Sequence, residues 1–161
     1  MKRREIKELR KDLNTKESLG LDAELIKRKR SLFIRHLDCG SCNGCELELN
    51  ALTNSIYDIA SYGIHFEASP RHADVLAMTG VFTRNLAEAA RLTLEAMPTP
   101  QIIAVGDCAI DGGIFKDRKS YAIMEKPEEI KKAIINEIRV PGCPPEPGVI
   151  LKALLKYKHA E

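Results

Sequence analysis

Five cysteines carry the clearest chemistry in this sequence. Three lie in the run CGSCNGC, and the other two stand alone far along the chain. Four thiolates from separate loops can together surround one iron–sulfur cluster. The candidate ligands are Cys45, Cys108 and Cys143, together with either Cys39 or Cys42. Spacing alone does not decide whether Cys39 or Cys42 supplies the first of these thiols.

Two other uses of the thiols fit part of the pattern. A zinc ion also binds four thiolates, but zinc ribbons usually supply two close pairs rather than one pair and two single cysteines. A redox dithiol would use the pair Cys42 and Cys45 and would leave Cys108 and Cys143 unexplained. The spacing therefore favours a cubane cluster over zinc, and the glycines beside the cysteines allow the backbone to approach an inorganic core.

Composition and charge indicate one folded domain with a basic leader. The chain has 161 residues, 44% of them hydrophobic, and no apolar run approaches the roughly 20 residues of a membrane span. Residues 1–30 carry a net charge of +5 and residues 31–161 a net charge of −3. We therefore predict a basic helical arm over 1–30 and a cytoplasmic cluster-binding domain over 31–161, with its thiols reduced. The acidic body and the 5% aromatic content argue against nucleic-acid binding.

Short apolar strands alternate with helical patterns from residue 31 onward. The predicted strands cover residues 31–37, 63–68, 74–79, 101–105 and 138–140. The predicted helices cover residues 45–53, 85–97, 127–135 and 147–158. This alternation predicts an α/β fold, a doubly wound parallel sheet with helices on both faces.

The predicted strands place every cysteine at one edge of the sheet. The CGSCNGC run follows the first strand, Cys108 follows the fourth, and Cys143 follows the fifth. Ligands of doubly wound sheets bind beyond the carboxyl ends of the strands. The topology therefore predicts one thiol-lined site at that edge.

Five ordered motifs carry a resemblance to a known family. They are DCGSCNGCELE at 38–48, SPRHADVL at 69–76, GDCA at 106–109, GGIF at 112–115 and PGCPP at 141–145. Together they resemble the small, cluster-bearing subunit of membrane-bound, energy-converting [NiFe] hydrogenases, including the formate hydrogenlyase type. They are also similar to the homologous cluster subunit of respiratory complex I.

The resemblance implies a flavodoxin-like fold with one [4Fe–4S] cluster and an electron-transfer role. By the family's pattern, Cys42 and Cys45 supply the first two ligands, Cys108 the middle one and Cys143 the last, which makes Cys39 the extra cysteine. The implied partners are a hydrogenase-type large subunit, a ferredoxin-like subunit and membrane subunits that hold the protein at the membrane. The alternatives are the equivalent subunit of a complex I-like quinone or sulfur reductase, or a zinc-binding interaction module.

Four polar residues near these motifs invite specific interpretations. Asp107 precedes the middle cysteine, and an ionised acid there would lower a cluster's reduction potential. Glu46 reads as a helix N-terminal acid favoured by the macrodipole. His36, within an apolar strand, reads as a hydrogen-bonded structural histidine. The family places the loop of Arg71 near the cluster, where its guanidinium would donate hydrogen bonds.

Overall fold

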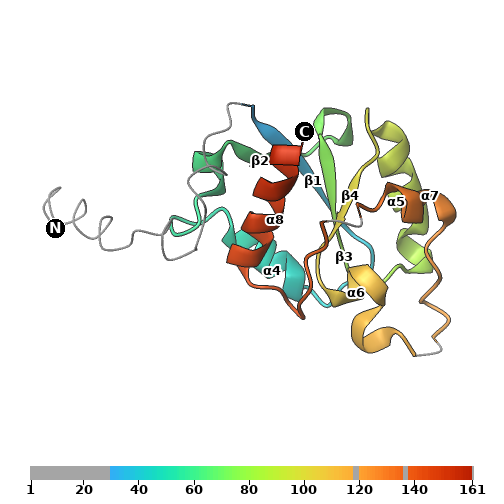
Figure 1. Cartoon of the computed structure of the whole chain (residues 1–161). Helices are drawn as coiled ribbons and strands as arrows, with labels where there is room; N and C mark the ends of the chain where they lie inside the picture. The colour runs from blue at the N-terminus through green and yellow to red at the C-terminus, as the bar shows by residue number, and fades with distance from the viewer. Residues whose placement is uncertain (1–29, 118–119, 136–137, 161) are drawn as a thin grey trace, which may run out of the picture.

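The computed structural model describes residues 30–117, 120–135 and 138–160. Its centre is a parallel sheet with the strand order β2-β1-β3-β4, the order of a flavodoxin-like sheet (Figure 1). The strands are β1 (Leu32–Asp38), β2 (Ile64–Phe66), β3 (Val75–Thr79) and β4 (Ile102–Ala104). The predicted parallel α/β fold is confirmed, whereas the predicted arm over 1–30 lies almost wholly outside the described residues.

Helices cover both faces of the sheet. They are α4 (Gly44–Ala51), α5 (Arg84–Ala96), α6 (Asp107–Asp111), α7 (Glu128–Ala133) and α8 (Pro147–Ala160). Helices α4 and α8 lie on one side of the sheet, and α5 and α7 lie on the other (Figure 1). Short 3-10 turns are η1 (Ile59–Tyr62), η2 (Pro70–His72) and η3 (Gly113–Phe115). Among the described helices, none has the length and hydrophobicity needed to cross a bilayer.

Strand β3 separates two hydrophobic cores. All five of its residues are buried, and successive side chains point to opposite faces. Val75 and Ala77 pack in the core that contains the buried side chains of α4 and α8. Leu76 and Met78 pack in the core that contains Ala90 of α5. Because β3 is buried on both faces, its sequence is a continuous apolar run rather than an alternating one.

The predicted fifth strand over 138–140 is not formed as a strand. Within the described residues, this segment contributes one isolated parallel bridge, between Val105 and Val140. Val140 donates to the carbonyl of Ala104 at 3.0 Å and accepts from Gly106 at 2.7 Å. The next N–H that could bond to the end of β4 is that of Gly142, but it donates to Asp107 Oδ1 and not to the Gly106 carbonyl, so the ladder ends at Val140. The segment still reaches the edge of the sheet where the strand was expected.

Candidate metal centre

The first cysteine loop is fixed at the carboxyl end of β1 by hydrogen bonds from its backbone to the Asp38 side chain. Asp38 Oδ1 accepts hydrogen bonds from the N–H groups of Gly40 and Ser41, each at 2.7 Å. Gly80, after β3, has φ +77°, and an added Cβ would lie 2.5 Å from the Ser41 nitrogen. These contacts hold the loop against the end of β3 and deliver Cys45 to the first turn of α4.

The other two loops converge on the same edge. Cys108 lies in the first turn of α6, directly after β4, and Cys143 follows the bridge at Val140. An alanine methyl placed at Gly106 would lie 2.5 Å from Cys45 Sγ, so the backbone after β4 lies directly against that sulfur. The structure therefore brings the first and middle loops into contact, as the topology predicts.

The four candidate thiols influence one another electrostatically. Burial raises the pKa of Cys45 to about 12, and negative charge on Glu46 and then on the three other thiols adds to the rise. Burial likewise raises the pKa of Cys108, and Cys143 and Cys42 contribute next. In the absence of a metal, Cys45 and Cys108 are therefore neutral thiols at pH 7, and metal binding would have to displace their protons.

Cys39 lies apart from this set. It is fully buried in the core on the α5 side of the sheet, together with Leu37, Met78 and Phe82. Burial also raises the pKa of Cys39 to about 12, but the charges that act on it belong to Asp38 and Lys126 and not to another cysteine. The structure thus separates Cys39 from the four thiols, although their role as ligands remains a prediction.

The site is half open to the surface. Cys42 and Cys143 are exposed, whereas Cys45 and Cys108 are half-buried. Two thiols therefore lie at a rim and two lie deeper. Within the described residues, no three His, Cys, Asp or Glu side chains are grouped as they would be around one metal ion. A zinc ion needs all its ligands within about 2.3 Å of one atom, whereas a cluster distributes its thiolates over several irons, and an all-cysteine set on three loops fits the latter.

Asp107 has a structural role that the sequence did not reveal. Its Oδ1 accepts a hydrogen bond from the Gly142 N–H at 2.8 Å, and its own N–H donates to the Gly142 carbonyl at 2.9 Å. This reciprocal pair connects the residue before Cys108 to the residue before Cys143. We call this pair of hydrogen bonds the Asp107 brace, because it fixes the middle loop against the last loop.

We expect Asp107→Ala to release iron from the site about tenfold faster than Asp107→Asn, because only alanine leaves the Gly142 N–H without an acceptor. Both variants remove the carboxylate charge, so their difference isolates the hydrogen bond from the effect of charge on potential. The measurement is the rate of iron transfer to a chelator under anaerobic conditions. Equal rates in the two variants would show that the brace does not hold the site together.

Glu46 lies in the first turn of α4, as expected of a helix N-terminal acid, but its side chain points into the protein. It is only 9% exposed, and its Oε1 accepts a hydrogen bond from the Thr79 hydroxyl. His36 Nε2 lies 3.0 Å from the same hydroxyl and 3.5 Å from Glu46 Oε1. Burial lowers the pKa of His36, although Glu46 and Asp38 partly oppose the effect. Glu46 and the buried Leu49 are three residues apart, so both lie on the inward face of α4. This spacing is the feature of the sequence that could have predicted the burial of Glu46.

The prediction for Arg71 is not supported. Its 3-10 turn precedes β3, so it lies at the amino end of that strand. The candidate thiols lie beyond the carboxyl ends of β1 and β4. In a parallel sheet these are opposite edges, five residues of β3 apart. Arg71 therefore cannot donate hydrogen bonds to a group held by these cysteines within this chain.

The fold and the site together define a class: parallel α/β proteins that gather cysteine thiols from several loops at the carboxyl edge of the sheet. The family can now be named. The chain belongs to the family described as NADH ubiquinone oxidoreductase, 20 Kd subunit, whose model matches residues 42–157. The match begins at Cys42 and includes all four candidate thiols.

Two relatives are named as subunits of formate hydrogenlyase and of a probable membrane-bound hydrogenase. Formate hydrogenlyase subunit 7 of Escherichia coli (strain K12) is 38% identical over 134 residues, which cover 82% of this chain and 51% of that protein. This chain thus spans about half the length of the E. coli relative. The probable membrane-bound hydrogenase subunit mbhJ of Pyrococcus furiosus is 37% identical over 127 residues, which cover 78% of this chain and 73% of that protein.

A solved structure extends the likeness to a third kind of complex. A chain of the membrane-bound sulfane sulfur reductase, an archaeal respiratory membrane complex, superposes with a TM-score of 0.63 at 28% identity. The match covers 84% of this chain and 73% of that chain. The predicted relationship to hydrogenase and complex I-type subunits is confirmed.

Proposed function

We propose that this protein is the electron-transfer subunit of a membrane-associated oxidoreductase complex and holds one [4Fe–4S] cluster. The ligands are Cys42, Cys45, Cys108 and Cys143. The observation that carries the proposal is that these four thiols, from three loops, lie at one edge of the sheet. They are close enough there for the charges of the others to raise the pKa of Cys45 and Cys108. Family membership and the relatives in membrane-bound hydrogenases support it.

Each part of the site has a task in this proposal. When bound, the cluster supplies reversible one-electron chemistry at low potential. Cys45 and Cys108 hold it from the half-buried side, which keeps water away from that part of the site. Cys42 and Cys143 hold it at the exposed rim, where an electron can pass to or from a partner. The Asp107 brace fixes the spacing of the middle and last ligands.

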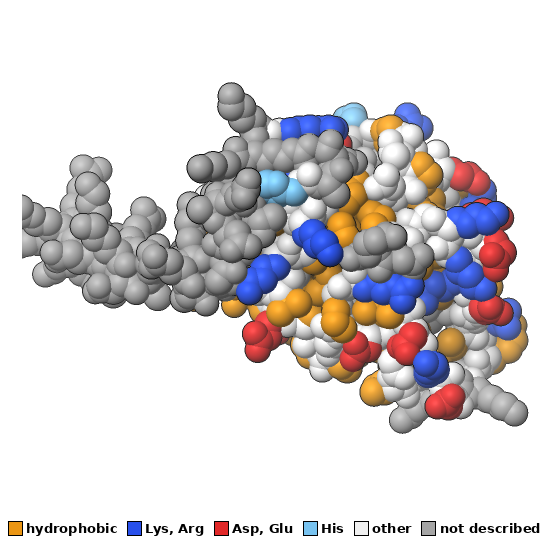
Figure 2. Space-filling model, in the orientation of Figure 1, with side chains coloured by type: hydrophobic (Ala, Val, Ile, Leu, Met, Phe, Trp, Pro, Cys, Tyr) orange, Lys and Arg blue, Asp and Glu red, His pale blue; other side chains and the backbone are white. Residues whose placement is uncertain are grey.

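The partners are other subunits of the complex. Large hydrophobic side chains are exposed near the thiol edge: Leu47 of α4 is 60% exposed, Ile114 of η3 63% and Val149 of α8 42%. Figure 2 shows hydrophobic side chains reaching the surface over the region of α4 and the start of α8. We assign this edge to a hydrogenase-type large subunit, with a ferredoxin-like subunit and membrane subunits completing the complex. The chain would then be peripheral to the membrane on its cytoplasmic side.

A second candidate is the equivalent subunit of a sulfur or quinone reductase. It is favoured by the likeness to the sulfane sulfur reductase chain. The two candidates differ in the metal of the large subunit and not in the site on this chain. Nickel analysis of the purified complex distinguishes them, because only a [NiFe] hydrogenase contains nickel in the partner.

The deciding experiment is metal analysis and EPR spectroscopy of the complex. We expect about four irons on the four thiols of each copy of this chain, and a reduced cubane signal that disappears when Cys108 is replaced with alanine. Signals from clusters of other subunits remain in that variant and serve as the internal control. Zinc in place of iron, with no signal lost in the variant, would instead identify a zinc-binding interaction module and end the electron-transfer proposal.

A further inference from the structure

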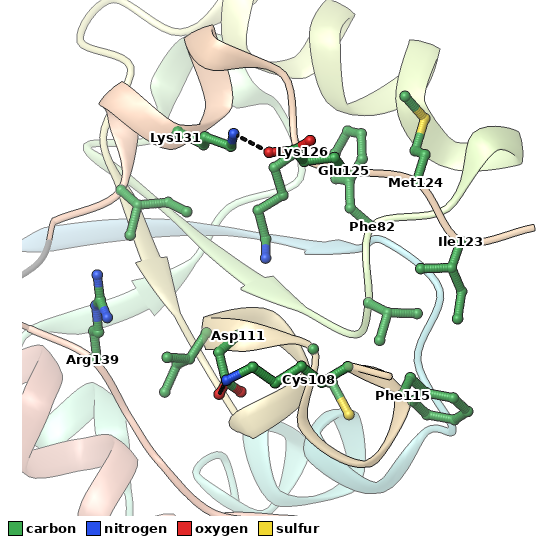
Figure 3. Close-up of a pocket in the computed structure, with 15 residues that line it drawn as sticks. Phe82, Cys108, Asp111, Phe115, Ile123, Met124, Glu125, Lys126, Lys131 and Arg139 are labelled. Atoms are coloured by element: carbon green, nitrogen blue, oxygen red, sulfur yellow. Dashed lines mark hydrogen bonds and ion pairs between the residues drawn. The ribbon is translucent and has the colours of Figure 1, made fainter. Parts of the chain in front are cut away.

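A cavity of about 610 Å³ opens beside the middle cysteine, on the side of the sheet covered by α5 and α7. Its wall includes Cys108, and its apolar lining includes Phe82, Ile123, Met124 and Ile134. The volume lies within the range of small-molecule sites, roughly 300–1,000 Å³. Figure 3 shows Lys126 reaching into the middle of this space, with Cys108 on the wall across from it.

Among the described residues, four basic side chains and two acidic ones line the cavity. Asp111 is paired with Lys116 at 2.9 Å, and Glu125 is paired with Lys131 at 2.6 Å. Both acids are therefore engaged by cations of their own. Lys126 adds a further positive charge to the same cavity, which Arg139 also lines.

Lys126 is the most informative of these cations. In the described part of the chain its ammonium group has no hydrogen-bond or ion-pair partner, and it is half-buried. Burial lowers the pKa of Lys126, and the nearby charges of Arg139 and Lys131 lower it further, against the opposing effects of Cys39 and Asp111. A partly desolvated cation without a counter-charge is costly, so a bound anion would relieve the cost.

We propose that this cavity binds a small organic anion, with a carboxylate or phosphate head against Lys126 and an apolar body against Phe82, Ile123 and Ile134. An anion of this kind matches both parts of the lining, the Lys126 ammonium group and the hydrophobic wall. A bare inorganic anion would satisfy Lys126 and leave most of the apolar surface uncovered. Nothing in the proposed electron-transfer role requires this site.

The position of the cavity predicts an effect on electron transfer, and this second step rests on the proposed cluster. Because Cys108 is in the cavity wall, a bound anion adds negative charge near the cluster, which stabilises its oxidised form. Linkage then requires that reduction weakens anion binding by the same factor. A tenfold weaker affinity for the reduced form corresponds to a potential lowered by about 59 mV.

The test measures binding of phenyl phosphate to the purified complex by calorimetry, with inorganic phosphate and phenol as partial probes. We expect saturable binding of phenyl phosphate, tighter than that of either partial probe. Lys126→Met should weaken it about tenfold or more, because a charge-assisted hydrogen bond is lost. Lys132→Met is the matched control, because Lys132 is exposed on α7 and outside the cavity lining. Thermal unfolding of both variants confirms that each is folded.

Three outcomes overturn the anion site. The first is that phenyl phosphate shows no saturable binding to the complex, as expected if a partner side chain fills the cavity. The second is that the two lysine variants bind phenyl phosphate with equal affinity. The third is that inorganic phosphate binds as tightly as phenyl phosphate. A midpoint potential that falls as phenyl phosphate is added supports both the site and its coupling to the cluster. Binding that depends on Lys126 without any shift of potential keeps the anion site and counts instead against a cluster on Cys108.

Discussion

Replacing Gly106 with alanine is expected to abolish cluster binding, whereas the same change at Gly44 leaves the cluster in place. Gly106 has φ +88° and ψ 152°, a backbone region that is essentially restricted to glycine and costs any other residue about 1–3 kcal/mol. The new methyl would also lie 2.5 Å from Cys45 Sγ, where no carbon can remain without moving the sulfur. Both effects displace the ligand loops relative to one another.

Gly44 is the matched control because it is next to the same thiols without the same constraints. An alanine methyl there would lie 3.5 Å from Cys42 Sγ and 3.7 Å from the Pro144 side chain, which are ordinary contacts. Gly44 begins α4, where alanine is a better helix former than glycine. The measurement is iron per chain and the reduced EPR signal of the complex. Full cluster occupancy in Gly106→Ala would contradict the close packing of the β4 loop on Cys45.

The gathering of the cysteines at one edge of the sheet was predictable because it depends on short segments of sequence. Each cysteine motif directly follows an apolar segment with strand character, and parallel strands bring their carboxyl ends together. The β1 and β4 segments formed as expected, within a residue or two of the predicted ends. Although the fifth strand is not formed, the single bridge at Val140 holds the chain at this edge, and Cys143 follows it there. A site that depends only on strand order tolerates errors in strand length.

Contacts between distant loops were not predictable from the same patterns. The Asp107 brace joins residues 35 positions apart, and the bond from Thr79 to Glu46 joins residues 33 apart. An acid beside a cysteine has the same sequence signature whether it tunes a potential or accepts a backbone hydrogen bond. Helix α6 is another such case, because its five residues are too few to show a helical period. Tertiary placement decided the role in each case.

The cavity next to Cys108 illustrates a third limit. Its cations come from the residue after η3, from the segment before α7, from α7 itself and from the residue before Val140. In the sequence, Lys126 is one lysine among many. Only the fold places its ammonium group in the cavity, with no ion-pair partner among the described residues, so a binding site of this kind is a property of the packing.

Cysteine substitutions give the other large expected effect. Cys45→Ser should remove the cluster and lower electron transfer through the complex by at least about a hundredfold, because a hydroxyl is a poor ligand for iron compared with a soft thiolate. Cys45 is the most central of the four thiols: the charges of the other three all act on it, and the backbone at Gly106 lies against its sulfur. The measurement combines iron content, the EPR signal and turnover of the intact complex.

Cys39→Ala is the control, because it removes a neighbouring thiol from the same sequence motif. Cys39 is fully buried among Leu37, Met78 and Phe82 in the core on the other side of β3. The charges that shift its pKa come from Asp38 and Lys126 and not from another cysteine. Its loss should cost about 1 kcal/mol of stability from the small cavity left behind, and iron content and potential should stay unchanged. If Cys39→Ala lost the cluster and Cys45→Ser kept it, the first ligand pair would have to be reassigned. The two thiols lie six residues apart in sequence on opposite sides of the sheet, so the contrast tests the topology as much as the chemistry.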